Sequence, residues 1–264
     1  MHLACQEGMA PGSDLREKLD NLAACGYEGI EFGGSGLMNR VAEIRAVIAN
    51  HPIKPSTVCG GFSGCPLDSD RGEREKALRD IKNLLAASAD LGAVGMIFVP
   101  LFGGPRVPDL SPYMNPIQLE TELLYKLMDE MGNEAGKRGV KLLLEPLNRY
   151  ETHLINRLEQ GVAVCEKLQN ENIAIMADFF HMSIEEPDIA ESIRKAGRWI
   201  SHVHLADSNR QLPGYGHTDF KSGFRALKEI GFDKYMALEC GIPGTDRKAE
   251  LKRSADFMKA AMSA

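Results

Sequence analysis

Residues 200–219, ISHVHLADSNRQLPGYGHTD, combine a short apolar strand with a polar loop that is rich in glycine and proline. Side chains alternate between the two faces of a strand, so His202 and His204 share one face. His204 is the last histidine before the loop and is expected near the C-terminal end of the strand. Three other apolar runs also end in an ionisable residue: LLLE at Glu145, IAIMAD at Asp178 and MALE at Glu239. Four strands that each end in a possible metal ligand predict one shared site.

Strand-like runs alternate with amphipathic helical segments along the whole chain. The expected strands are residues 1–5, 29–32, 56–59, 95–100, 141–145, 173–178, 200–205 and 235–239. The expected helices are residues 15–25, 39–50, 71–91, 116–138, 157–169, 189–196, 221–230 and 247–262, with Asp14 as a cap and Gly26 as a stop for the first. Such alternation implies parallel strands with right-handed crossovers. Eight units in about 250 residues predict the α/β class and a single (β/α)8 TIM barrel domain over residues 1–264.

An open, doubly wound sheet is the alternative architecture. It normally carries a glycine-rich phosphate loop after its first strand, and the corresponding EGMAPGSD is not G-x-G-x-x-G. The closed barrel is therefore favoured.

The amino-acid composition limits which binding partners and which cellular compartment are expected for the protein. The net charge of −6 disfavours a nucleic-acid backbone as a partner. No run of 18 apolar residues predicts a membrane span, and the first residues do not read as a signal peptide. The six cysteines form no C-x-x-C pair, so we expect reduced thiols in a cytoplasmic protein. A disulfide between Cys59 and Cys65, the closest pair, is left open.

The polar strand ends predict a metal centre. Strands five to eight are neighbours in a barrel, so the side chains at their C-terminal ends can converge on one point. Three carboxylates in a partly desolvated mouth would repel one another, and a divalent cation would neutralise them. Three carboxylates with one imidazole suit Mn²⁺, with Mg²⁺ or Co²⁺ possible, better than Zn²⁺. A lone carboxylate at a strand end is more often a helix cap, so the prediction rests on all four residues: Glu145, Asp178, His204 and Glu239.

Other polar residues receive less specific interpretations. His202 is expected as a hydrogen-bonded interior histidine, and Glu31 as a supporting group across the barrel mouth. His181 reads equally well as a surface histidine or as a substrate contact. Glu185 and Glu186 are expected to cap the next helix. Three further histidines have no possible ligand or catalytic partner near them in the sequence pattern, and they are expected to be structural or exposed: His2, His51 and His153.

Four motifs carry a family resemblance: EPLNRYE (145–151), DFFHM (178–182), HVHLADSNRQLPGYG (202–216) and the late pair LE (238–239). Together they resemble the xylose isomerase-like sugar isomerase/epimerase superfamily, and most closely the D-tagatose/D-psicose 3-epimerases, with hydroxypyruvate isomerase as a near relative. The resemblance implies metal ligation by Glu145, Asp178, His204 and Glu239. It also implies substrate contacts by Glu151, His181 and Arg210.

The resemblance further implies a ketose 3-epimerase that works by proton transfer through an enediolate. Glu145 and Glu239 would face each other across the reacting carbon as the catalytic acid–base pair. One would remove the proton and the other would return one to the opposite face. Return to the neighbouring carbon would instead give aldose–ketose isomerisation.

Several alternatives stay open at this point. One is an isomerase acting on hydroxypyruvate or on an inositol-derived ketone. A DNA-repair endonuclease of the related three-zinc barrel type is remote, because it would need more histidine ligands and a basic groove. A non-catalytic sugar-binding barrel is disfavoured because both acid–base candidates are present.

The expected partner is a small sugar or hydroxy-carbonyl substrate, with no nucleic acid and no membrane. A homo-oligomer, a dimer or tetramer, is expected from the resemblance and from apolar residues of the 101–116 loop that read as exposed. These residues could equally form a lid over the site: Leu101, Phe102, Tyr113 and Met114.

Overall fold

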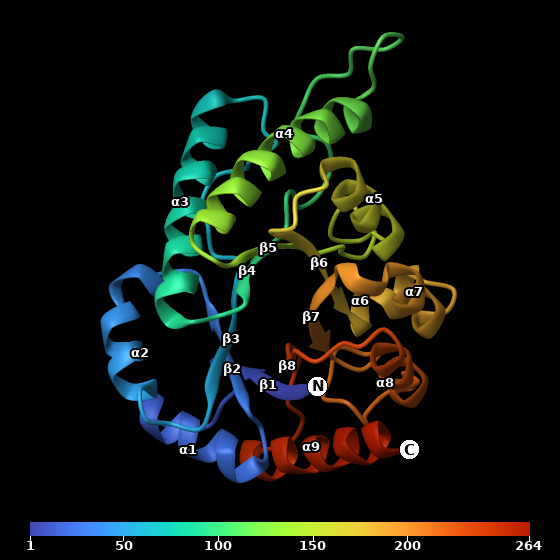
Figure 1. Cartoon of the computed structure of the whole chain (residues 1–264). Coiled ribbons are helices and arrows are strands. Elements are labelled where there is room, and N and C mark those ends of the chain that lie inside the picture. The colour runs from blue at the N-terminus through green and yellow to red at the C-terminus, as the bar shows by residue number, and fades with distance from the viewer.

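Eight parallel strands form a closed barrel in chain order (Figure 1). The structure is a computed structural model that describes residues 1–264. The strands are β1 His2–Gln6, β2 Gly29–Gly33, β3 Lys54–Cys59, β4 Gly95–Phe98, β5 Lys141–Leu144, β6 Ile173–Asp178, β7 Ile200–Leu205 and β8 Tyr235–Leu238. Pairing of β1 with β8 closes the ring. The predicted (β/α)8 TIM barrel is therefore confirmed.

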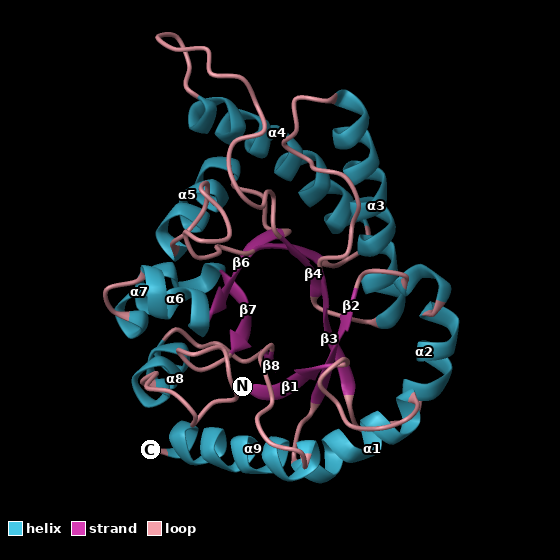
Figure 2. Cartoon of the chain, turned by 180° about the vertical axis from the view of Figure 1, so that it is seen from behind, coloured by secondary structure: helices cyan, strands magenta, loops and turns pink.

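Helices surround the strands on the outside of the barrel (Figure 2). They are α1 Leu15–Cys25, α2 Val41–Ile48, α3 Arg71–Leu91, α4 Pro116–Lys137, α5 Leu158–Leu168, α6 Phe179–Glu185, α7 Ile189–Ala196, α8 Phe220–Glu229 and α9 Arg247–Ser263, with short 3-10 turns η1 Leu37–Asn39 and η2 Gly197–Trp199. The helix expected over 39–50 is divided between η1 and α2. Helix α6 is not among the expected elements. None of the helices is long and apolar enough to cross a membrane.

Several helices begin after a short side chain that accepts a hydrogen bond from a backbone N–H group in the first turn. Asp14 accepts from Glu17 N at 2.9 Å, and Gly26 ends α1 with a φ of 88°. The expectation that Glu185 and Glu186 cap the next helix is wrong, because Asp188 caps α7. An aspartate reaches the first turn of its own helix, whereas the longer glutamates reach across to neighbouring segments.

Both of these glutamates bind chain segments that lie before them in the sequence. Glu185 accepts hydrogen bonds from the backbone and the guanidinium of Arg149. Glu186 accepts from the backbone N–H of Leu158 at the start of α5. Both contacts join the α6–α7 region to the segment after β5.

The apolar core has two parts. A cluster of 61 buried residues fills the space between the strands and the helices. A separate cluster lies inside the barrel, where Leu143 shares the face of β5 that leads to Glu145. Its members are Ile97, Leu143, Ala174 and Met176. This inner layer excludes water beneath the polar strand ends.

The long loop after β4 projects away from the barrel as an extended green segment (Figure 1). Tyr113 is 92% exposed and Phe102 is 57% exposed, as expected. Leu101 is a correction, because only 2% of it is exposed and it packs into the main core. Met114 is half-buried, so of the four residues only Phe102 and Tyr113 are exposed.

The loops that follow β2 and β3 touch through their backbones. A Cβ on Gly61 would lie 2.2 Å from the backbone nitrogen of Ser35, and a Cβ on Gly34 would lie 2.0 Å from the Gly60 carbonyl oxygen. Gly61 also has a φ of 88°, a conformation that other residues rarely adopt. Glycine at these positions lets the β3 loop approach the barrel mouth.

Substitution of Gly61 by alanine is expected to lower the free energy of unfolding by about 2 kcal/mol or more, because overpacking and a positive φ both oppose a Cβ there. Urea denaturation measures the change. Gly104→Ala is the matched control, since a Cβ at Gly104 meets nothing within 4 Å. Equal stability of both variants would contradict the close approach of the two loops.

Candidate metal centre and active site

Three carboxylates and one imidazole converge at the C-terminal mouth of the barrel. Glu145 directly follows β5, Asp178 ends β6, His204 lies in β7 and Glu239 directly follows β8. One candidate ligand atom from each lies within 4.8 Å of all the others. Asp178 and His204 are also register partners in the β6–β7 pairing. The structure thus brings together the four residues that the sequence singled out.

The two ring nitrogens of His204 face different environments. Nε2 lies 3.0 Å and 3.1 Å from the two carboxylate oxygens of Glu31. Nδ1 has no hydrogen bond, although it is buried and lies 3.2 Å from Glu239 and 3.7 Å from Glu145. A proton on Nε2, donated to Glu31, leaves the Nδ1 lone pair directed at the carboxylates. This is the arrangement of a histidine ligand oriented by a carboxylate behind it.

Glu31 is fully buried and gathers donors from three strands of the barrel: β1, β3 and β7. It accepts hydrogen bonds from Thr57 and Gln6, and it lies 3.0 Å from Nε2 of His202. His202 is therefore the interior, hydrogen-bonded histidine that the sequence predicted. Glu31 occupies the supporting position expected across the mouth.

Gln6 is a site residue that the sequence analysis missed. Its Nε2 donates to Glu31 and to Glu239 Oε1, both at 2.9 Å. It is the last residue of β1, so the strand-end rule could have identified it. It was missed because β1 was expected to end one residue earlier, at Cys5.

Burial and charge shift the carboxyl groups in opposite directions. Burial raises the pKa of Glu145 well above its ordinary value, and the charges of Glu239 and Asp178 add to the increase. Burial would raise the pKa of Glu239 too, but His204 and Arg210 outweigh it and lower this pKa to about 2. Buried carboxylates at such distances need positive charge between them, which a cation supplies.

Arg210 provides part of that positive charge. Its Nη1 donates to Asp178 at 2.6 Å and its Nη2 contacts Glu239. The guanidinium also lies over the ring of Phe180, 4.7 Å from its centre. The proposed substrate contact therefore sits directly beside the carboxylates.

His181 lies on α6, and the interpretation as a surface histidine is wrong because only 2% of it is exposed. Its Nδ1 accepts from the backbone N–H of Asn148 at 3.2 Å, which places the proton on Nε2. Nε2 lies 3.6 Å from Asp178. Burial lowers the pKa of His181, so the neutral ring is favoured.

Asn148 links His181 to Glu151 and was also missed. Its Nδ2 lies 2.8 Å from Nδ1 of His181 and donates to Glu151 at 2.9 Å. Glu151 itself is 3.9 Å from the ring nitrogen. Asn148 lies inside the EPLNRYE motif, but amides give no ligand or acid–base signal by which to single them out.

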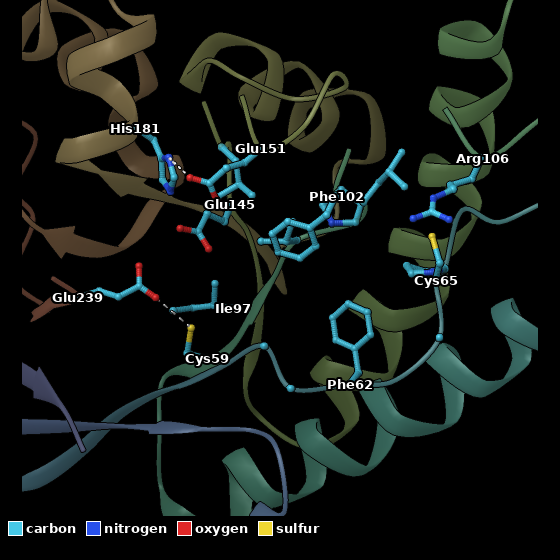
Figure 3. A pocket seen from close by; sticks show the side chains of 18 of the residues that line it. Cys59, Phe62, Cys65, Ile97, Phe102, Arg106, Glu145, Glu151, His181 and Glu239 are labelled. Carbon is cyan, nitrogen blue, oxygen red and sulfur yellow. Dashed lines mark hydrogen bonds and ion pairs between the residues drawn. The ribbon is translucent and has the colours of Figure 1, made fainter. Parts of the chain in front are cut away.

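A cavity of about 360 Å³ is lined by Glu145, Glu151, His181, Arg210 and Glu239. Figure 3 shows Glu145 and Glu239 pointing into the same space, with His181 and Glu151 beside them. The other end of the cavity is formed by Phe62, Phe102, Cys65 and Arg106. A carboxylate-rich inner end and an aromatic outer end suit a small polar molecule that carries an apolar face.

A second group of possible ligands is Glu31, Cys59 and His204. Burial raises the pKa of the Cys59 thiol well above its ordinary value, which keeps it protonated. A thiol is a weaker ligand than a thiolate, so the carboxylate-rich group is the better metal site. Cys59 and Cys65 are both free thiols, which answers the question of a disulfide between them.

Asp207 holds the loop that carries Arg210. Its buried carboxylate accepts backbone N–H groups from Ser208, Gly214 and Thr218 at 2.8–3.0 Å. Burial opposes its ionisation, but these N–H groups outweigh it and lower the pKa of Asp207. The stabilisation is therefore present at neutral pH and is lost as the pH falls through the lowered pKa.

Asp207→Asn is expected to loosen this loop, because one amide oxygen cannot accept all three N–H groups. Cleavage by trypsin after Arg210 should become faster than in the wild type, while the far-ultraviolet circular dichroism stays the same. Asp256→Asn on the exposed face of α9 is the control and should leave the rate unchanged. An unchanged rate at Asp207→Asn would refute the loop-holding role.

The site can be compared with known proteins. A family model described as xylose isomerase-like TIM barrel matches residues 19–261. The chain is 30% identical over 235 residues to 3-dehydro-D-guloside 4-epimerase from Escherichia coli (strain K12), covering 88% of this chain and 89% of that protein. It is 36% identical over 237 residues to D-psicose 3-epimerase from Enterocloster bolteae, covering 86% and 77%.

A solved structure of 3-keto-D-glucoside 4-epimerase from E. coli superposes with a TM-score of 0.89 at 27% identity, covering 98% of this chain and 99% of that chain. The curated relatives are sugar epimerases, which are isomerases. The match over residues 19–261 and this likeness lead to one conclusion: the chain belongs to the xylose isomerase-like TIM barrel family.

Proposed function

We propose that this protein is a divalent-metal-dependent sugar epimerase of the ketose 3-epimerase type. The observation that carries the proposal is the pair of carboxylates, Glu145 and Glu239, that point into one cavity beside a possible metal site. The names of the two relatives describe the same type of reaction, inversion of a carbon next to a ketone. A 3-epimerase of psicose inverts the carbon next to a C2 ketone, and a 4-epimerase of a 3-dehydro sugar inverts the carbon next to a C3 ketone.

The cation would be held by Nδ1 of His204 and by the carboxylates of Glu145, Asp178 and Glu239. The donor set fits such an ion, because Nδ1 is buried without a hydrogen bond and three carboxylates surround it. We propose Mn²⁺, with Mg²⁺ or Co²⁺ as alternatives, since oxygen donors dominate. When bound, the ion polarises the substrate carbonyl and stabilises negative charge on the enediolate. Glu31 fixes the ring of His204 for this role.

The chain's own residues move the proton. One of Glu145 and Glu239 takes the proton from the carbon next to the carbonyl, and the C–H electrons form the enediolate double bond. The other glutamate delivers a proton to the opposite face, which inverts the centre. Nε2–H of His181 and the guanidinium of Arg210 hydrogen-bond substrate oxygens beside the carbonyl. Glu151, through Asn148, holds His181 in place.

A 3-keto glycoside is a second candidate substrate. The aromatic outer end of the cavity, with Phe62 and Phe102, offers surfaces on which a sugar ring or an aglycone could lie. A screen of free ketoses and 3-keto glycosides with Mn²⁺, read by chromatography, distinguishes the two candidates. Removal of a proton from C1 of the ketose, with return of a proton to C2, would appear in the same screen as an aldose.

Glu145→Gln and Glu239→Gln are each expected to lower kcat by about 10²-fold to 10⁴-fold, because glutamine cannot accept a proton. Wild type in D₂O should incorporate deuterium at the inverted carbon. Variants with one remaining glutamate should exchange this proton on one face without inverting the centre. NMR of the recovered sugar measures both quantities.

Glu166→Gln, on an exposed turn of α5, is the matched control and should keep full activity. Metal content must be measured in each variant, since glutamine is also a weaker ligand. Near-normal rates in both active-site variants at full metal occupancy would overturn the assignment and leave His181 as the next candidate base.

We also propose a homo-oligomer, a dimer or tetramer. Its support is the exposed apolar surface of the loop after β4 and of the start of α4, where Leu110, Tyr113 and Ile117 are 47%, 92% and 51% exposed. Static light scattering at micromolar concentration should give at least twice the monomer mass, and Tyr113→Ser should reduce it. A monomer would contradict the oligomer and favour a lid.

We propose a cytoplasmic location for the protein. Its support is that all six cysteines are free thiols, which is typical of a reducing compartment.

A further inference from the structure

A second cavity opens at the opposite end of the barrel from the carboxylates. We call it the basal cavity; its volume is about 280 Å³. Lys141 is the first residue of β5, Ser201 is the second residue of β7, and Lys234 directly precedes β8. All strands are parallel, so these N-terminal ends share one mouth. The polar and aromatic residues that line it are Lys141, Gln169, Glu171, Arg198, Trp199, Ser201 and Lys234.

The basal cavity has an excess of positive charge. The ammonium of Lys141 donates to the carbonyl oxygen of Glu171 at 2.6 Å, and that of Lys234 donates to the hydroxyl of Ser201 at 2.9 Å. Neither lysine, nor Arg198, forms any of the ion pairs found in the chain. Glu171 is the one acidic residue in the lining, which leaves a formal excess of two positive charges.

Asp233, next to Lys234 in sequence, does not compensate this charge, because it pairs with the N-terminal amine at 2.9 Å. Burial lowers the pKa of Lys234, and the charge of Lys141 lowers it further. The two ammonium groups therefore repel each other, and no carboxylate forms an ion pair with either of them. Such an arrangement costs free energy unless an anion is shared between them.

Ser201 adds a buried donor. It is 2% exposed, and its oxygen accepts from Lys234, but its own proton has no acceptor among the hydrogen bonds of the chain. In the pairing with β6, Ile200 and His202 have partners and Ser201 is the extra residue between them. This irregularity places a serine hydroxyl at the cavity.

We propose that the basal cavity binds a phosphate group, either as inorganic phosphate or as part of a small phosphate ester. A phosphate dianion matches the formal excess of two positive charges. Its oxygens accept from ammonium, guanidinium and hydroxyl groups, and all three kinds of donor are present. The site lies away from the carboxylates, so the inference does not depend on the proposed epimerase activity.

Trp199 gives a direct probe, because it is the only tryptophan in the chain. The guanidinium of Arg198 lies over its ring, 4.8 Å from the centre. Titration with inorganic phosphate should give a saturable change in tryptophan fluorescence, which sodium chloride at equal ionic strength does not give. Lys234→Gln and, separately, Lys141→Gln should each weaken binding by about tenfold through loss of a charge-assisted hydrogen bond.

Lys126→Gln is the matched control, since it removes the same charge from an exposed position on α4 outside the cavity. Phosphate should also raise the thermal midpoint of the wild type and of Lys126→Gln, but much less that of Lys234→Gln. Glycerol phosphate and glycerol form the second pair of titrations. Binding of the ester alone assigns a phosphorylated metabolite, and equal binding of phosphate assigns the free ion.

Two results would overturn the proposal. One is the absence of any saturable response in fluorescence and thermal midpoint up to about 10 mM of phosphate or glycerol phosphate. The other is an equal response in wild type, Lys234→Gln and Lys141→Gln, which would assign the effect to general salt screening. Ser201→Ala, which keeps every charge, separates the two explanations, since only a specific site is weakened by loss of one hydroxyl.

Discussion

Electrostatic repulsion among buried carboxylates is the constraint on which this site depends. Glu145, Asp178 and Glu239 meet around Nδ1 of His204, and Glu31 lies against its Nε2. The barrel can hold this much negative charge only because positive groups are interleaved with it. The guanidinium of Arg210 supplies part of that charge, and a divalent ion would supply the rest. The same charges would polarise a ketone and stabilise its enediolate.

The fold places these groups through features that are not themselves catalytic. Parallel strands put four polar side chains at one mouth, and an apolar layer beneath them excludes water. Gly61 lets the β3 loop reach the mouth, and Asp207 holds the loop that presents Arg210. The long loop after β4 carries Phe102 to the outer end of the cavity. The carboxylate end of the cavity is thus built on strand ends, and its aromatic end is built on loops.

Much of the fold, and the convergence of the four candidate ligands, could be predicted from the sequence, because both follow from short-range patterns. Strand ends are marked by a change from apolar residues to an ionisable one, which located Glu145 and Asp178. Helix α6 was missed because it begins directly after β6, with Asp178 serving both strand and helix. Asn148 was missed because its contact with His181 joins segments far apart in the chain, which no local pattern reveals. Asp207 was missed because its partners are backbone N–H groups of its own loop, and these come together only when the loop folds back on itself.

The central claim is that one divalent ion is held by Glu145, Asp178, Glu239 and Nδ1 of His204. Anomalous diffraction at the manganese edge, from crystals grown with Mn²⁺, tests it most directly. The account predicts one peak in contact with all four groups, with Nε2 of His204 still bonded to Glu31. A peak between Glu31, Cys59 and His204, or at none of the four ligands, would contradict it.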